Sequence, residues 1–198
     1  MELDFQYLPG QTPLDEDEKE GLLIRSISTR GELDEFEQQN IEEAVIWTLK
    51  KKFSTEEILS EAFICQLHTI MYREVWRWAG DFRQSNKNIG VDKYQIGIAL
   101  RQLTDDAKYW VEHATYENDE LVIRFKHQLV NIHCFPNGNG RHSRLIADVL
   151  ASHGFNNPVF SWGGNNLVQQ GDTRQRYLEA IWAADAGNVQ PLIDFARS

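Results

Sequence analysis

The sequence predicts an all-α domain that is interrupted by one small β-hairpin. Apolar residues recur at helical spacing through most of the chain, and helix-opening signals precede two of these stretches. Residues 83–95 break the helical pattern. The chain has 198 residues, 41% of them hydrophobic, and this length and composition suffice for one domain with a well-filled core.

The first predicted helix begins at a capping box, in which Thr29 and Glu32 can satisfy the first amide groups of a helix. It runs to about residue 52, and its candidate core-facing residues are Leu33, Phe36, Ile41, Ala44, Val45 and Leu49. A second helix opens at Ser54, and its apolar residues Ile58, Phe63, Leu67 and Met71 can pack together.

Further helices are predicted at about residues 95–113, 119–132, 142–153 and 173–186. We divide the chain into an N-terminal arm with one helix, residues 1–57, and a main domain, residues 58–198. Between the second and third helices, asparagine, lysine and glycine alternate with Ile89 and Val91, which predicts a short hairpin around residues 86–91.

Charge and cysteine content narrow the possible partners and location. The formal charge is −10 and the isoelectric point about 5.0, which disfavours binding to nucleic acid or to an anionic membrane. Cys65 and Cys134 form no disulfide framework and fit a reducing cytoplasm. The acidic N-terminus is unlike a secretion signal, so we expect a cytoplasmic protein.

The most informative stretch is HCFPNGNGRHSR, residues 133–144, between two apolar-periodic segments. Gly138 and Gly140 leave the backbone open, so that amide groups can point at an anion beside the N-terminus of the following helix. Arg141 and Arg144 are three residues apart and face the same side of that helix. Guanidinium groups suit phosphate oxygens, so these residues predict a polyphosphate site with His133 at its edge.

This stretch resembles the Fic-family signature HxFx(D/E)GNGRxxR. Together with the segments TPLDEDEKEGL, STRGELDEFEQQNI, VWRWAGDFR and NKNIGV, it is similar to the Fic subfamily called mobile mystery protein B. The resemblance implies the Fic fold, a helical bundle around the motif loop with a small hairpin flap. It also implies an enzyme that transfers AMP from ATP to a hydroxyl group of a target protein.

The resemblance assigns a role to each matching position. His133 is the expected base that takes the hydroxyl proton. Gly138, Asn139 and Gly140 form the expected anion hole, Arg141 contacts the β-phosphate, and Arg144 contacts the γ-phosphate. Mg²⁺ is the expected cofactor, bridging the phosphates of ATP. The target protein is expected to bind along the flap, where Lys87 adds a phosphate contact.

Position 137 departs from the family pattern, which has Asp or Glu as a ligand of the metal. An amide oxygen of Asn137 can still bind a hard cation, but it brings no charge, so metal affinity should fall. Tyr177 could border the pocket for the base, although Tyr177 and Trp182 are expected mainly in the core, as helical aromatic residues usually are.

Many Fic proteins carry an inhibitory glutamate that reaches the second motif arginine and displaces the γ-phosphate. The usual pattern, (S/T)xxxE(G/N), has no clean copy in this sequence. Glu32 has a capping role already, so Glu37 is the expected inhibitory residue, with Arg144 as its partner. A solvated acidic surface remains an alternative for Glu37.

Several functions stay open beside AMP transfer. The group transferred could be UMP, phosphocholine or phosphate, although the kinase-like relatives have lysine where this chain keeps Gly140. The protein could instead be a non-enzymatic nucleotide sensor that partners a mobile-element regulator, with Asn137 marking lost catalysis.

Overall fold

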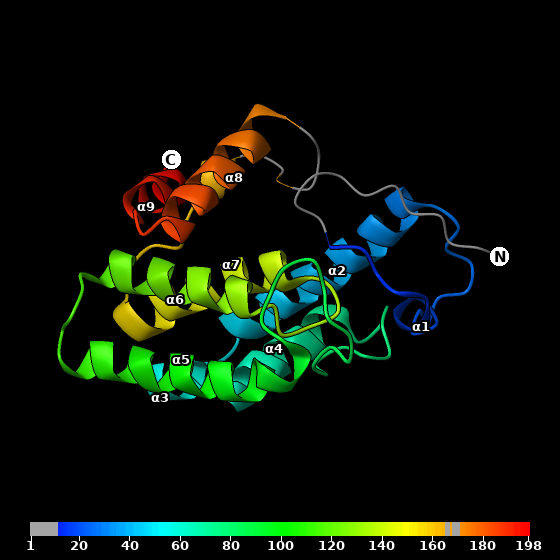
Figure 1. Cartoon of the computed structure of the whole chain (residues 1–198), viewed down its shortest axis with the longest axis horizontal. Coiled ribbons are helices and arrows are strands. Elements are labelled where there is room, and N and C mark those ends of the chain that lie inside the picture. The colour runs from blue at the N-terminus through cyan, green and yellow to red at the C-terminus, as the bar shows by residue number, and fades with distance from the viewer. Residues whose placement is uncertain (1–11, 165–166, 168–170) are drawn as a thin grey trace.

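The computed structural model describes residues 12–164, 167 and 171–198, and the regular elements of these residues are all helices (Figure 1). The α-helices, in chain order, are α1 Glu16–Lys19, α2 Arg30–Leu49, α3 Thr55–Ile58, α4 Glu61–Tyr72, α5 Ile96–Glu112, α6 Asn118–Ile132, α7 Asn139–Val149, α8 Asp172–Asp185 and α9 Gln190–Arg197. A π-helical turn, Leu150–Gly154, follows α7 directly, and short 3₁₀ turns lie at Lys93–Gln95 and Trp162–Gly164.

Side-chain caps set the helix starts near the N-terminus. Thr29 and Glu32 form the predicted capping box of α2. The helix predicted to open at Ser54 is in fact two helices. Ser54 caps the four residues of α3, and Ser60 then caps α4 by accepting a hydrogen bond from the amide of Phe63. The hydroxyl of Ser60 also donates to the Glu57 carbonyl, which ends α3.

The buried face of α2 differs from the one predicted. Its buried residues are Leu33, Glu37, Asn40, Ala44 and Thr48, which follow helical spacing, whereas three predicted core residues, Phe36, Val45 and Leu49, are exposed. The buried polar residues have partners on the chain after α4. Glu37 accepts from the indole of Trp76, and Asn40 accepts from the backbone amide of Glu74. These bonds make burial of a polar face favourable.

The motif loop lies where α6, α7 and α4 meet. Helices α6 and α7 pack against each other, α5 packs against α6, and α2 and α7 both pack against α4. Helices α8 and α9 form a pair that reaches the rest of the domain mainly through α9 and α6 (Figure 1). The sequence interpretation missed α9, in which Leu192, Phe195 and Ala196 are buried.

The predicted hairpin at residues 86–91 is wrong, because no strand occurs among the described residues of this segment. Side chains, rather than a backbone ladder, join its two arms. The guanidinium of Arg83 donates to the carbonyls of Ser85 and Val91, and Asn86 bonds both the Asp92 carboxylate and the Lys93 amide. The segment therefore forms a side-chain-braced loop beside the motif, which we call the 83–92 loop.

The N-terminal arm, residues 12–24, crosses the domain beside the segment after α4. Leu22 forms an isolated antiparallel bridge with Trp76, and the amide of Arg77 donates to the carbonyl of Gly21. The indole of Trp78 donates to the carbonyl of Glu18 at 2.9 Å. Within the described part of the chain, no helix combines the length and apolar character that a membrane crossing needs.

Candidate functional site

Two residues with left-handed backbone shape the loop between α6 and α7. His133 ends α6 with φ of 56°, and Gly138 precedes α7 with φ of 79°. A Cβ atom on Gly138 would lie 2.5 Å from the ring of Tyr72, so both conformation and space require glycine there. The loop therefore turns sharply and presents His133 and the start of α7 to the same side.

Asn139 clamps this loop from inside. Its side-chain oxygen accepts from the amide of Phe135 at 3.0 Å, and its side-chain amide donates to the carbonyl of Phe135 at 2.7 Å. Asn139 is buried, so its side chain acts on the loop, and only its backbone amide remains available to an anion. The amides of the first helical turn have no acceptor within a helix, which suits them to bind phosphate.

His68 on α4 holds the same loop from the other side. It accepts from the amide of Gly80 through Nδ1, so Nε2 carries the proton and donates to the carbonyl of Asn137 at 3.0 Å. Its ring stacks on Phe135 with centroids 3.8 Å apart. Burial keeps the pKa of His68 well below its usual value, which fits this neutral, two-bonded state.

His133 is buried, and only 5% of its surface is exposed. Burial, helped by the positive charge of Arg83, lowers the pKa of His133 to about 4, so the ring is neutral at pH 7. The guanidinium of Arg83 donates to the backbone carbonyl of His133 at 2.6 Å, which fixes the residue at the end of α6. Nε2 lies 3.1 Å from the hydroxyl oxygen of Thr12.

A pocket of about 500 Å³ opens between the motif loop and α8. The motif loop and the start of α7 line it with His133, Asn137, Gly138, Asn139, Gly140, Arg141 and Arg144, and Thr12 and Arg30 line it from the N-terminal region. Helix α8 lines it with Arg174, Tyr177, Leu178, Ile181, Trp182 and Asp185, beside Leu167. The structure thus brings most predicted site residues to one pocket, and the volume falls in the range of small-molecule sites. Aromatic and aliphatic side chains of α8 suit a nucleotide base, and the arginines and amides at the start of α7 suit its phosphates.

Glu37 and Arg141 form a buried ion pair, with Oε2 and Nη2 2.7 Å apart. Glu37 was expected to reach Arg144, and this expectation is wrong in the present structure. Arg144 lies one turn further along α7, where its guanidinium faces the ring of Tyr177 at 5.6 Å. Burial alone would lower the pKa of Arg141, but the adjacent Glu37 carboxylate raises it above its ordinary value.

The two aromatic residues of α8 differ from the prediction in one respect. Tyr177 is buried and also lines the pocket, so it serves both expected roles. Trp182 lines the pocket but is 57% exposed, so its predicted core position is wrong. The hydroxyl of Tyr177 accepts from the buried ammonium of Lys126 at 2.6 Å, which anchors α8 to α6 on this side of the pocket.

The residues around position 137 offer little to a metal ion. Within the described ranges, no group of three histidine, cysteine or acidic residues is placed to bind one. The side-chain oxygen of Asn137 accepts from the amide of Gly138 at 2.7 Å, and its amide donates to the carbonyl of Thr12. One neutral oxygen fits a Mg²⁺ ion that is held mainly by phosphates and water.

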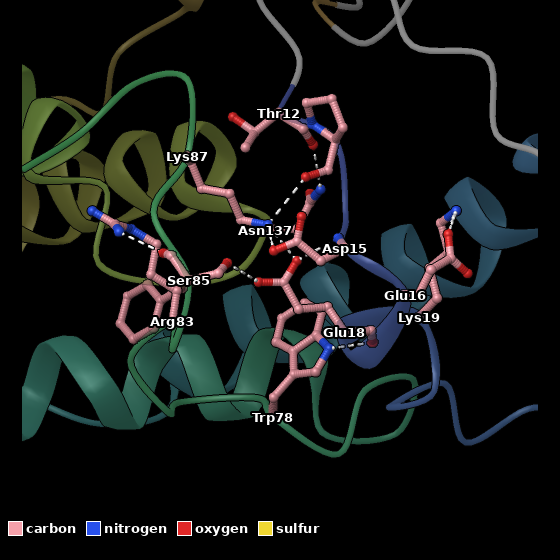
Figure 2. Close-up of polar contacts among 12 residues, drawn as sticks. Thr12, Asp15, Glu16, Glu18, Lys19, Trp78, Arg83, Ser85, Lys87 and Asn137 are labelled. Carbon is pink, nitrogen blue, oxygen red and sulfur yellow. Dashed lines mark hydrogen bonds and ion pairs between the residues drawn. The ribbon is translucent and has the colours of Figure 1, made fainter. Parts of the chain in front are cut away.

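Lys87 lies away from the expected phosphate site. Its ammonium is 2.9 Å from Asp15 and 2.5 Å from Glu18, and it donates to the carbonyl of Pro13 (Figure 2). The Lys87 side chain is only 3% exposed in this cluster, and Lys87 is not among the described residues that line the pocket. The structure therefore uses Lys87 to hold the N-terminal arm against the 83–92 loop.

Sequence reasoning missed three residues that shape the site: Thr12, His68 and Arg83. Arg83 ends the segment VWRWAGDFR, whose resemblance to the family marked it without giving it a role. Thr12 begins the segment TPLDEDEKEGL, which the resemblance likewise marked without giving it a role, whereas His68 lies on an apolar helix where no local pattern singles it out. Cys134, beside the base, is 1% exposed, and burial raises the pKa of its thiol to about 12, which disfavours the thiolate form that a nucleophile needs.

Comparisons with known proteins agree with this geometry. Residues 58–151 match the model of the Fic/DOC family. Among solved structures, the chain is similar to BepC from Bartonella tribocorum with bound AMPPNP, with a TM-score of 0.66 and 18% identity over 92% of this chain and 97% of that one. It is also similar to the N-terminal Fic domain of a putative cell filamentation protein from Bartonella quintana with bound ADP, with a TM-score of 0.62 and 18% identity over 87% and 86%.

A third similar structure is a Fic domain-containing signaling protein from Bacteroides thetaiotaomicron, with a TM-score of 0.58 and 16% identity over 80% of this chain. The match spans 63% of that longer protein. Identities this low show a shared fold. No curated protein matches the sequence.

Proposed function

Since the family model and the structural neighbours support a domain of the Fic/DOC family in this chain, we propose that the protein transfers AMP from ATP to a hydroxyl group of a protein. The N-terminal segments quoted above also favour the mobile mystery protein B subfamily. Two of the similar structures hold AMPPNP or ADP, which supports ATP as the donor here.

One observation carries the proposal: His133 and the two motif arginines line the same pocket, with a hydroxyl oxygen 3.1 Å from Nε2 of the histidine. A base within hydrogen-bond distance of a hydroxyl is the arrangement that proton abstraction requires. Guanidinium groups and amides at a helix N-terminus, a few residues along the chain, suit the negative charge of phosphates.

These positions suggest a separate role for each site residue in the transfer reaction. Neutral His133 takes the proton of the acceptor hydroxyl as its oxygen attacks the α-phosphate. The amides of Asn139 and Gly140 receive charge that develops on the phosphates, whereas the amide of Gly138, the third expected donor, is held by the side chain of Asn137. The guanidinium of Arg141 binds the β-phosphate and that of Arg144 the γ-phosphate. Mg²⁺, bound through phosphate oxygens and Asn137, would supply further positive charge.

We propose that α2 restrains this reaction through Glu37. Its carboxylate occupies the guanidinium of Arg141 in a buried pair, and a β-phosphate oxygen would need the same guanidinium. ATP in a productive position therefore competes with Glu37. A regulatory partner that moves α2, or a target protein that binds along the 83–92 loop, would shift this competition.

The experiment is a transfer assay with ATP labelled on either the α- or the γ-phosphate, using the full chain and a cell lysate. Label from the α-phosphate on proteins, absent with His133→Ala, supports AMP transfer. Label from the γ-phosphate instead would mean phosphate transfer, and competition by UTP or a choline-bearing nucleotide would identify another donor. Nucleotide binding without any label on protein would favour a sensor.

A further inference from the structure

We propose that Thr12 is itself an acceptor of the AMP group, presented to the active site by the N-terminal arm of the same chain. This inference rests on the proposed function and names a substrate for it. The arm then has two roles, as an intramolecular substrate and as a competitor of other target proteins.

The first support is the position of the Thr12 hydroxyl. Its oxygen lies 3.1 Å from Nε2 of His133, and Thr12 lines the same pocket as Arg141 and Arg144. Thr12 is 7% exposed, so the hydroxyl is held in the pocket and away from solvent. With the ring proton on Nδ1, neutral His133 accepts the hydroxyl proton at Nε2, as a general base does.

The second support is the number of separate contacts that hold the arm in register. Next to the hydroxyl, the carbonyl of Thr12 accepts from Asn137 at 3.3 Å, and the carbonyl of Pro13 accepts from Lys87 (Figure 2). Asp15 and Glu18 then form ion pairs with the buried Lys87 ammonium. These contacts fix the backbone from Thr12 to Glu18, on the C-terminal side of the attacking oxygen.

Further along, the arm is tied to the domain by an unrelated set of contacts. The indole of Trp78 donates to the carbonyl of Glu18, and the hydroxyl of Ser85 donates to its carboxylate. The antiparallel bridge between Leu22 and Trp76 holds the end of the arm. Because residues 12–22 are held against the domain, the hydroxyl of Thr12 stays near His133. The reaction therefore avoids the entropy cost of bringing two separate molecules together.

The reaction is balanced with ATP as the co-substrate. The hydroxyl oxygen of Thr12 forms a bond to the α-phosphorus, and the bond from that phosphorus to the bridging oxygen of the β-phosphate breaks. The hydroxyl proton moves to Nε2 of His133, and pyrophosphate leaves past Arg141 and Arg144. The product carries an AMP ester on Thr12.

The test uses the full chain as wild type, Glu37→Gln, Thr12→Val and Thr12→Ser, each incubated with ATP and Mg²⁺. Valine has nearly the shape of threonine but no hydroxyl, whereas serine keeps the hydroxyl and serves as the matched control. Intact mass and peptide mapping report the site of modification, and time courses at several protein concentrations report whether the reaction is intramolecular. Label transfer to lysate proteins is measured in parallel.

The expected result is one AMP group on Thr12, formed faster in Glu37→Gln, retained in Thr12→Ser and lost in Thr12→Val. The rate constant should not change with protein concentration, and an inactive His133→Ala chain should not be modified by an active one. Lysate proteins labelled without an adduct on Thr12 would overturn this inference and leave the proposed function standing. No label on any protein would overturn both.

Discussion

Oε2 of Glu37 lies 2.7 Å from Nη2 of Arg141, and its second oxygen accepts from the indole of Trp76 at 2.6 Å. The pair links α2 to the first turn of α7, at the point where phosphates are proposed to bind. Because Glu37 is buried and the Arg141 side chain is only 15% exposed, removing either charge leaves the other poorly compensated. The ion pair is therefore expected to affect both the stability of the fold and the rate of transfer.

Glu37→Gly should increase transfer activity and lower the melting temperature. The glycine frees Arg141 for phosphate, but it leaves a buried guanidinium without its carboxylate, a change that typically costs about 3–5 kcal/mol of folding free energy. Glu37→Gln separates the two effects, because it keeps the helix and a hydrogen-bond acceptor for Trp76. Initial rates with labelled ATP and thermal melts of both variants make the comparison.

Glu32→Gly is the control for this prediction. Glu32 accepts from the amides of Ser28 and Thr29, so its loss should weaken the start of α2 without raising the rate. If Glu32→Gly activates and Glu37→Gly does not, the inhibitory residue is misassigned. If neither activates, α2 does not restrain the enzyme.

His133→Ala should abolish transfer and leave ATP binding nearly unchanged. The imidazole acts on the proton, whereas amides and arginines act on the phosphates, and loss of a general base typically lowers rates by ~10²–10⁴-fold. Calorimetric titration with a non-hydrolysable ATP analogue measures binding, and labelled ATP measures transfer. Wild-type rates in the alanine variant would exclude His133 as the base.

Asn137→Asp should raise the Mg²⁺-dependent rate. A carboxylate adds the charged ligand that position 137 lacks, and it also loses the hydrogen bond that Asn137 donates to the carbonyl of Thr12. Rates titrated with Mg²⁺ should reach half-saturation at lower metal concentration than in wild type. Asn137→Ala, which provides neither ligand, is the matched control, and equal metal dependence in all three chains would remove position 137 from the metal site.

Two glycines of the motif should respond differently to alanine. At Gly138, the new Cβ would lie 2.5 Å from Tyr72 at φ of 79°, so Gly138→Ala should destabilise the fold by roughly 1–3 kcal/mol. At Gly140, the new Cβ meets only Nη1 of Arg144, 3.9 Å away. Gly140→Ala should fold normally yet bind nucleotide more weakly, as melts and titrations can establish.

Stability should fall as the solution is acidified below pH 6.5. Burial lowers the pKa of His142 from 6.5 to about 4, so between these values the unfolded chain binds a proton that the folded chain does not. Stability in this window therefore rises with pH, and His142 alone accounts for roughly 3 kcal/mol. His133 acts in the same direction, whereas Asp148, whose pKa burial raises to about 6, opposes them.

His142→Gln isolates that contribution, because glutamine can still donate to the Ile64 carbonyl but does not titrate. Chemical denaturation at pH 7, 5.5 and 4.5 should show a weaker pH dependence for the variant than for the wild type. An identical dependence in both chains would show that His142 is protonated in the folded state.

The sequence predicted correctly those parts of the site whose residues lie close together in the chain. His133, Gly138, Arg141 and Arg144 lie within one loop and the helix turn after it, so their spacing was enough to predict that they share a pocket. Contacts between distant segments were predicted less well. Glu37 does meet a motif arginine, but which one depends on how α2 is rotated, and Trp76 decides that rotation.

The wrong predictions for α2 and for the hairpin have a common cause. In both places, polar groups form hydrogen bonds with residues that are not apparent from the local sequence. Phe36 was placed inside by its apolar character, yet Glu37 and Asn40 are buried because the chain after α4 offers them hydrogen bonds. The hairpin was predicted from alternation, yet Arg83 satisfies the carbonyls that a ladder would have used. Thr12 is 121 residues from His133, and the quoted segment that begins with it gave no sign that its hydroxyl meets the base.

The arm and α2 belong to one continuous segment that contacts two pocket-lining residues: Thr12 contacts His133, and Glu37 contacts Arg141. Because the two contacts lie on one segment, breaking either of them weakens the other. By thermodynamic linkage, a target protein that lifts the arm would then raise the affinity for ATP, and ATP would raise the affinity for the target by the same factor. Such reciprocity would make the enzyme respond cooperatively to two different substrates within a single chain.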